Sequence, residues 1–327
     1  MAVTIEAPAR LHLGFLDLGG ERGRVFGSIG VAIEQPRYVL EVRPADRIEA
    51  HGEAREECLR IVERVSRQLR LGRGVRVHGL ASIPRHVGFG SGTQLELSLA
   101  SAIARLFDLP VPMEELARMA GRGRRSGVGI ATFEKGGFVV DAGRRQGPLN
   151  GRGVDALPDG ELPLVVVHHP VPDDWFFVIV TPEGAEGVSG DREERIFMAL
   201  PPMGEHKVGK ICRLTLMKVI PGVLNDDIRG FGEAITEIQI LMGEHFAPYQ
   251  GGMYSTPIGK EIAEFALKQG AHGVGQSSWG PTMFALVRGE GAASTLAGKL
   301  KGHVGEGRAA IFYTRASNRG ATWRHVA

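Results

Sequence analysis

A glycine-rich segment near residue 90 has the composition of a phosphate-binding loop. Gly88, Gly90 and Gly92 fall at alternate positions directly before a segment with helical periodicity. Glycines let successive backbone N–H groups turn toward one point, and a helix N-terminus adds unpaired donors and the positive end of its dipole. A tight strand-to-helix turn without a ligand would have a similar sequence. The expected phosphate-binding residues of this segment are Gly88, Gly90, Ser91, Gly92 and Thr93.

Basic side chains close to this segment could add positive charge for an anionic ligand. Arg85 and His86 directly precede the glycines, and a basic run follows at 122–125. Guanidinium groups bind phosphate and carboxylate groups through two parallel hydrogen bonds. The basic run is equally compatible with a solvated helix end, but we favour a phosphate-facing role for Arg125 and the adjacent Ser126.

The composition limits the class of protein. The chain has 327 residues, is 43% hydrophobic and carries a formal net charge of +2, which gives no footprint for nucleic acid or anionic membrane. It contains no leader-like N-terminus and no apolar run approaching about 18 residues. Its two cysteines, Cys58 and Cys212, lie far apart and are both expected to be buried. We therefore expect a cytoplasmic enzyme without nucleic-acid or membrane partners.

Hydrophobic periodicity predicts alternating strands and helices and an α+β fold. The clearest helix is predicted at 93–107, where Leu95, Leu99 and Ile103 form one apolar stripe. A Gly- and Glu-rich stretch at 182–190 marks the expected boundary between domains 1–182 and 183–327. The other predicted helices span 56–71, 113–121, 192–199, 209–219, 226–242, 258–268 and 292–300. The predicted strands span 3–7, 38–42, 48–50, 75–77, 138–141, 164–168, 175–180, 282–287 and 309–313.

Three glycine-rich segments, in this order, resemble signatures of the GHMP kinase superfamily. They are Pro84-x-x-x-Gly88-Phe89-Gly90-Ser91-Gly92, Ser126-Gly127-Val128-Gly129 followed by Gly136-Gly137, and Gly270-Ala-His-Gly273-Val-Gly275-Gln-Ser277-Ser278-Trp-Gly280. The resemblance implies a two-domain GHMP-kinase fold, with a ribosomal-protein-S5-domain-2-like N-terminal domain and a ferredoxin-like C-terminal domain. It also implies that Ser277 and Ser278 lie at the edge of the ligand cavity.

The sequence departs from the kinase pattern at two positions. Gly129 stands where the kinases commonly have a catalytic Asp, and glycine cannot take a proton. Gly92 stands where they have a second Ser that helps to hold the metal and phosphate. Phosphoryl transfer depends on positioning, metal ions and charge stabilisation. Both losses therefore indicate that a phosphate site was kept while the reaction changed.

One subfamily of this fold, the β-ribofuranosylaminobenzene 5′-phosphate synthases, resembles the chain more closely. The resemblance is carried by Arg10-Leu-His12-Leu-Gly14-Phe-Leu-Asp17 with Arg22-Gly-Arg24, and by Gly136-Gly-Phe-Val-Val-Asp141-Ala-Gly143. It implies a decarboxylating pentosyltransferase of tetrahydromethanopterin biosynthesis. Phosphoribosyl pyrophosphate would react with 4-aminobenzoate or 4-hydroxybenzoate, lose pyrophosphate and CO₂, and give a C-riboside 5′-phosphate without ATP.

The charges in that reaction suggest roles for the N-terminal residues. Asp17 and Arg24 are the expected catalytic residues. Asp17 would stabilise positive charge at the anomeric carbon or hold Mg²⁺, the expected cofactor, but it could also only cap a turn. Arg10, His12 and Arg22 are expected to bind substrate, although Arg22 is equally compatible with solvated loop charge. A homodimer is expected because the resembling enzymes are often dimeric.

Two other functions stay open from the sequence. An ATP-dependent small-molecule kinase of the same superfamily would need another base in place of Gly129. A non-catalytic sensor could keep the fold and bind ligand without turnover. The segment at 204–211 nearly matches a Walker A loop, but Ile211 stands where a Ser or Thr must hold Mg²⁺, so it does not predict an ATP site.

Overall fold

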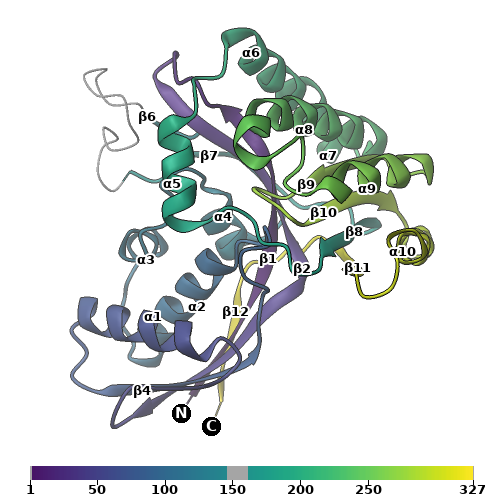
Figure 1. Cartoon of the computed structure of the whole chain (residues 1–327). Helices are drawn as coiled ribbons and strands as arrows, with labels where there is room; N and C mark the ends of the chain where they lie inside the picture. Colours follow the sequence, from purple (N-terminus) through teal and green to yellow (C-terminus); the bar gives the residue numbers. More distant parts are fainter. Residues whose placement is uncertain (1, 146–160, 327) are drawn as a thin grey trace.

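Two long antiparallel strands extend through the whole molecule. The computed structural model describes residues 2–145 and 161–326; residues 1, 146–160 and 327, which the expected domain ranges include, lie outside the described residues. β1 (Ala2–Asp17) and β2 (Arg24–Ala45) pair over most of their length and run from one end of the molecule to the other (Figure 1). Residues from both strands therefore contact both halves of the chain.

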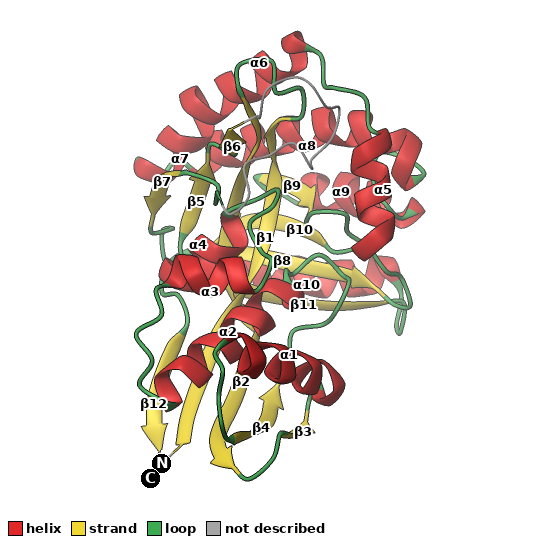
Figure 2. Cartoon of the chain, turned by 90° about the vertical axis from the view of Figure 1, so that its left-hand side faces the viewer, coloured by secondary structure: helices red, strands yellow, loops and turns green. Residues whose placement is uncertain are grey.

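Helices α1, α2 and α4 pack against the first sheet, and α6 and α8 also contact its strand β1. Its strand order is β12-β1-β2-β4-β3, while β5 and β6 pair with β2, and β7 pairs with β5. Figure 2 shows α1, α2 and α3 lying together against this sheet. The further strands are β3 (Glu49–Gly52), β4 (Gly74–Ala81), β5 (Phe138–Asp141), β6 (Arg144–Arg145), β7 (Val165–His169) and β12 (Thr322–Val326). The helices are α1 (Arg55–Gln68), α2 (Ser91–Leu106), α3 (Met113–Met119) and α4 (Val128–Lys135).

The second sheet has four antiparallel strands in the order β11-β8-β10-β9. Helices precede β9 and separate β10 from β11, which gives the β-α-β-β-α-β connectivity of a ferredoxin-like unit. Alternate residues of β8 pack on opposite faces: Phe176 belongs to the core under α9 and α10, and Phe177 to the core shared with α8. The elements are β8 (Trp175–Pro182), α9 (Pro257–Lys268), β9 (Gly273–Gln276), β10 (Met283–Arg288), α10 (Glu290–Val304) and β11 (Ala309–Arg315).

A helical segment joins β8 to α9. The Asp227 side chain accepts a 2.9 Å hydrogen bond from the Gly230 N–H and so caps the longest of these helices, α8. No helix in the described ranges is long and apolar enough to cross a membrane. The segment contains α5 (Gly190–Ala199), α6 (Glu205–Leu214), the π-helical turn η2 (Thr215–Val219), α7 (Ile220–Leu224) and α8 (Ile228–Gln250).

The structure confirms the α+β class and adds elements that periodicity did not predict. α4, β9 and β12 had no predicted counterpart, and β2 extends far beyond the predicted strand at 38–42. β8, which precedes the expected boundary at 182, pairs in the second sheet, and β12 returns to pair with β1. Cys58 is buried as expected, but the prediction for Cys212 is wrong, because α6 turns this residue toward solvent.

Candidate active site

A cavity of about 510 Å³ opens at the N-terminus of α2. Gly90, just before the helix, has a left-handed φ of 74°. The first N–H with an intrahelical acceptor is that of Gln94, which donates to Gly90 O at 3.2 Å. The N–H groups of Ser91, Gly92 and Thr93 thus precede the helical hydrogen bonds and lie at the positive end of the dipole. This cavity, which we call the anion cavity, therefore suits a phosphate group.

Glycine is required in this loop because other parts of the chain approach it closely. Gly88 has a φ of 102°, and a Cβ there would lie 2.5 Å from the Ser277 carbonyl oxygen. A Cβ on Gly90 would lie 2.9 Å from the Arg10 guanidinium carbon. The loop is thus enclosed between β1 and the loop that follows β9, so both sheets fix its position.

Arginines from separate segments surround the loop. Arg10, on β1, donates from Nη1 to Gly88 O, and burial lowers its pKa to about 10, so it remains a cation at neutral pH. Arg122 Nη2 would lie 3.1 Å from a Cβ on Gly92, which places its charge beside the first turn of α2. Burial also lowers the pKa of Arg122 and Arg125. A multiply charged anion would replace the water that these cations have lost.

Two carboxylates of α5 face these arginines across the cavity. Glu193 lies 3.5 Å from Arg125, and Glu194 lies 3.5 Å from Arg124. The Trp279 indole N–H donates to Glu193 Oε1 at 3.0 Å. Neither Glu193 nor Trp279 was predicted as a site residue, because a single Glu on an amphipathic helix has no motif and Trp279 lies in a segment whose pattern is carried by its glycines and serines.

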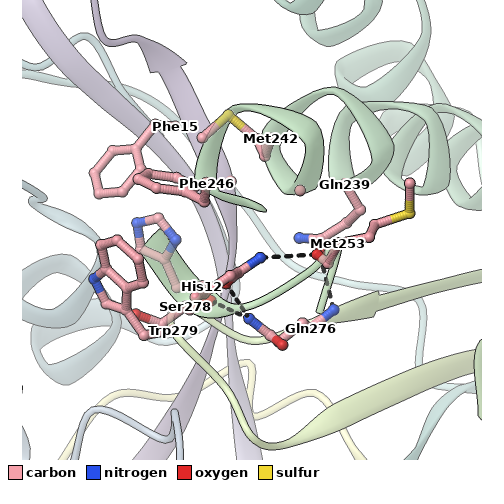
Figure 3. Close-up of a pocket in the computed structure, with 12 residues that line it drawn as sticks. His12, Phe15, Gln239, Met242, Phe246, Met253, Gln276, Ser278 and Trp279 are labelled. Carbon is pink, nitrogen blue, oxygen red and sulfur yellow. Dashed lines mark hydrogen bonds between the residues drawn. The ribbon is translucent and has the colours of Figure 1, made fainter. Parts of the chain in front are cut away.

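A second cavity, which we call the aromatic cavity, adjoins the anion cavity. It is narrow, with a volume of about 40 Å³, and the two cavities share His12, Phe15, Ser278 and Trp279. Figure 3 shows Phe15, Phe246 and Trp279 on one side of it, and Gln239, Met253 and Gln276 on the other. Its other lining residues are Gly14, Met242, Gly243 and Gln250.

His12 is a neutral side chain at the junction of the two cavities. It is 5% exposed, and burial, together with the nearby Arg10 charge, lowers its pKa to about 3. Neither ring nitrogen has a hydrogen-bond partner among the described residues, and Nε2 is fully buried. A buried imidazole without partners is unusual and suggests a position completed by ligand.

Most of the residues predicted from the sequence do meet at the anion cavity. Ser277 lies behind the cavity surface instead: its Oγ donates to Gly88 O at 2.7 Å and accepts from the His12 N–H at 3.0 Å. It therefore holds the glycine loop against β1. The predicted residues that line the cavity are Arg10, His12, Arg85, Gly88, Gly90, Ser91, Gly92, Thr93, Arg125, Ser126 and Ser278.

Asp17, Arg22 and Arg24 do not line the anion cavity, which corrects the expectation that Asp17 and Arg24 face it. The reason is that β1 continues as a strand to Asp17, and at about 3.3 Å per residue this carries Asp17 roughly 20 Å beyond Arg10. Asp17 Oδ1 accepts a hydrogen bond from the N–H of Gly19 at 2.6 Å. Its contacts are therefore those of a residue that caps a turn, the second role considered from the sequence.

The two arginines of this hairpin loop also have local partners. Arg24 donates to the carbonyl oxygens of Ala142 and Gly143, both at 2.7 Å. Arg22 is exposed and pairs with Glu205. Catalytic roles for Asp17 and Arg24 stay predictions.

Gly129 is located where α4 packs against α2. A Cβ there would lie 3.1 Å from Thr93 Cγ2, so a larger side chain would require Thr93 to shift. Gln94 Nε2 donates to Gly129 O at 2.9 Å and fixes the two helices together. Gly129, where the kinase pattern is expected to have an Asp, therefore lies directly beside the first turn of α2.

Asp141 positions the start of α4 from inside the first sheet. Its carboxyl accepts from the N–H of Gly127 at 3.0 Å and from that of Gly143 at 2.9 Å. Burial raises its pKa from 3.8 to about 7, which outweighs the opposing hydrogen bonds and the Arg24 charge. The folded state thus binds this proton more tightly than the unfolded state does.

Stability should accordingly fall as the pH rises through the titration of Asp141. The contribution is full below about pH 4 and is lost as the pH passes 7, so between pH 5 and 8 the free energy of unfolding should decrease by about 2 kcal/mol. Urea unfolding at both pH values measures this decrease.

Asp141→Asn should lack this decrease and be less stable at pH 5, because an amide NH₂ cannot accept a hydrogen bond from an N–H group. The exposed Asp46→Asn should keep it; an unchanged decrease in Asp141→Asn contradicts the assignment.

Among the described residues no group of three or more His, Cys, Asp or Glu side chains is arranged to hold a metal ion. The carboxylates that line the anion cavity are Glu193 and Glu194. Mg²⁺ is commonly held by one or two carboxylates together with substrate phosphates. Glu193 is engaged by Arg125 and the Trp279 N–H, whereas Glu194, which is half-exposed, can fit that mode as a single carboxylate. Asp17, the predicted metal ligand, has its Oδ1 engaged with backbone N–H groups.

Comparisons with known proteins agree with this geometry. The chain matches the models for the GHMP kinases N terminal domain over residues 56–137 and GHMP kinases C terminal over residues 219–305. It is 34% identical to the beta-ribofuranosylphenol 5′-phosphate synthase of Methanothermobacter thermautotrophicus over 98% of both chains. It is 33% identical to the protein of that name from Methanocaldococcus jannaschii, over 87% of this chain and 89% of the relative.

The solved structures show the same fold. The homoserine kinase of Cytophaga hutchinsonii matches with a TM-score of 0.67 over 99% of this chain and 97% of that chain, at 18% identity. Together with the two domain matches, this confirms the expected two-domain GHMP-kinase fold.

Proposed function

We propose, because the chain belongs to the beta-ribofuranosylphenol 5′-phosphate synthase family, that it transfers ribose 5-phosphate from phosphoribosyl pyrophosphate to a benzoate ring. A phenol product requires 4-hydroxybenzoate as acceptor, and 4-aminobenzoate would give the corresponding amine. The reaction is a decarboxylating pentosyl transfer on the route to tetrahydromethanopterin. One observation carries the proposal: the anion cavity combines a helix N-terminus with half-buried arginines, while Gly129 provides no base for a kinase.

The atoms balance without an added proton or oxidant. The bond between the anomeric carbon and the pyrophosphate oxygen breaks, and its electron pair leaves with pyrophosphate. The ring carbon that carries the carboxylate forms the new bond to the anomeric carbon. The bond to the carboxylate then breaks, its electron pair restores the aromatic ring, and CO₂ departs.

The described residues can supply the electrostatics of this reaction. N–H groups of Ser91, Gly92 and Thr93 would hold one phosphate of the donor, and Arg10 and Arg122 would bind the remaining anionic charge. Cations fixed before the reaction stabilise the leaving pyrophosphate without reorganisation. Glu193, on the opposite side of the cavity, could face the positive charge that develops at the anomeric carbon.

Mg²⁺ is part of the proposal as a cofactor, with Glu194 as a protein ligand and pyrophosphate oxygens as the others. When bound, it would neutralise charge on the leaving group.

We further propose a cytoplasmic homodimer. The exposed apolar side chains Leu216, Met217 and Leu224 on adjoining turns offer a contact area. Sedimentation should give twice the chain mass of 35.2 kDa, and a monomer at micromolar concentration would exclude the dimer.

The direct test follows CO₂ from carboxyl-labelled acceptor. We expect release of labelled CO₂ from 4-hydroxybenzoate or 4-aminobenzoate only when phosphoribosyl pyrophosphate is present, one pyrophosphate for each CO₂, and a loss of activity on addition of EDTA that Mg²⁺ restores. Release without the donor, or none with either acceptor, would contradict the proposal.

A nucleotide control separates this reaction from a kinase. Phosphoribosyl pyrophosphate should raise the melting temperature, because a ligand that binds only the folded state stabilises it. ATP should neither raise it comparably nor be required for CO₂ release. Transfer of the γ-phosphoryl group of ATP to an alcohol would favour the kinase alternative.

A further inference from the structure

The aromatic cavity has the walls of a site for a small flat ring. As it stands it is narrow, with a volume of about 40 Å³, so a ring would enter it by moving the flexible side chains of its wall aside. Phe15, Phe246 and Trp279 supply aromatic faces, and Met242 and Met253 supply flexible thioether side chains. The Phe246 and Trp279 ring centroids lie 4.5 Å apart at 62°, which fixes the shape of that wall.

The polar end of this cavity can accept hydrogen bonds but has few N–H groups to offer. Gln239 Nε2 donates to Leu13 O at 2.7 Å, and Gln250 Nε2 donates to Met253 O at 2.8 Å. Gln239 Oε1 accepts from the Gln276 N–H at 2.8 Å and keeps a second lone pair. A ligand group at this end would therefore have to be a donor, as hydroxyl and amino groups are.

The opposite end of the cavity meets the anion cavity. The shared residues are His12, Phe15, Ser278 and Trp279, and Arg10 precedes His12 by two residues on β1, so both side chains are on one face of the strand. A carboxylate at this end would face the Arg10 cation. The neighbouring His12 is uncharged, so Arg10 is the cation that this carboxylate would face. Binding by one cation leaves the carboxylate free enough to depart as CO₂.

We propose that the aromatic cavity binds the benzoate acceptor, with its 4-hydroxyl or 4-amino group against the glutamine carbonyl oxygens and its carboxylate toward Arg10. This assignment rests on the proposed function. It places the carboxylate-bearing ring carbon at the shared residues, next to the anomeric carbon of a donor in the anion cavity. The aromatic cavity would recognise the ring and its 4-substituent, whereas the anion cavity would recognise the phosphate groups of the donor.

Variants that fill the aromatic cavity test the assignment. Met242→Trp and Met253→Trp each place a larger side chain into it, and Met253 lies on a loop where the backbone can adapt if Met242→Trp does not fold. Calorimetric titration with 4-hydroxybenzoate should show affinity lowered at least 10-fold in either variant. Affinity for phosphoribosyl pyrophosphate should stay within about 2-fold of wild type. The matched control is Met198→Trp, because Met198 is 70% exposed and lines neither cavity, and it should change neither affinity.

A ligand series tests the orientation. 4-Methylbenzoate, which has the same shape but no donor, should bind the wild type about 5- to 10-fold more weakly than 4-hydroxybenzoate, the loss expected for one hydrogen bond. Equal binding of the two benzoates, or filled variants with unchanged acceptor affinity in an enzyme that turns over, would overturn the cavity assignment alone. A wild-type protein that releases no CO₂ would overturn the proposed function and this inference with it.

Discussion

Arg10→Ala should lower kcat/KM for the ribosyl transfer by about 1,000-fold while leaving the fold intact. Removing one preorganised group that stabilises developing charge typically costs 10²–10³-fold, and Arg10 is a desolvated cation that would face both the donor and the carboxylate. The fold should persist because Gly88 O, which accepts from Arg10, also accepts from Ser277 Oγ at 2.7 Å. Steady-state CO₂ release and a melting curve measure the two effects.

Two further variants make this prediction specific. Arg10→Lys keeps the charge but loses the planar pair of donors, so it should recover part of the activity and no more. Arg43→Ala removes an exposed arginine that pairs with Glu41 and should leave kcat/KM unchanged. Arg10→Ala with activity within about 5-fold of wild type would exclude Arg10 from the reaction and would require another cation for the carboxylate.

Gly88→Ala should abolish donor binding and lower stability. At a φ of 102° an L-residue is strained, and the new Cβ would lie 2.5 Å from the Ser277 carbonyl oxygen, a backbone atom that cannot rotate away. The glycine loop and the loop after β9 would have to separate. We expect donor affinity to fall at least 100-fold in calorimetry, and the free energy of unfolding to fall by about 2 kcal/mol or more in urea.

Gly184→Ala provides the matched control for Gly88→Ala. Gly184 also has a left-handed φ, 67°, but a Cβ there would meet nothing within 4 Å. It should therefore show only the modest cost of backbone strain, with normal donor affinity. If both variants behave alike, close approach of the two loops is not what requires glycine at position 88.

The sequence was most informative where the chemistry depends on backbone conformation. The alternate glycines before a helix predicted the tight turn ahead of α2, because other segments approach positions 88 and 90 too closely for a side chain. Phosphate binding by this turn stays a prediction. Most elements of the second unit were also predicted, since β8, β10, β11 and α10 each show clear periodicity, whereas β9 had no predicted counterpart.

The sequence was less informative where position depends on tertiary structure. The spacing of Arg10, Asp17 and Arg24 allowed one cavity or several, and only the extension of β1 to Asp17 decides between them. Glu193 and the aromatic cavity arise from packing of α5 and α8 against residues far away in the chain, and no local pattern encodes such contacts. The long N-terminal half of β2 was missed because its glycines are weak signals of a strand.

Ser277 has a consequence for how the protein unfolds. Its hydroxyl bonds to the backbone of both β1 and the glycine loop, although Ser277 itself belongs to the ferredoxin-like half. Separating the two halves would break the contacts that hold the glycine loop in place. We therefore expect that the halves cannot unfold independently while the donor is bound to this loop. At saturating donor, any separate thermal transitions should become a single transition at a higher temperature. The ligand would then stabilise both halves of the chain together.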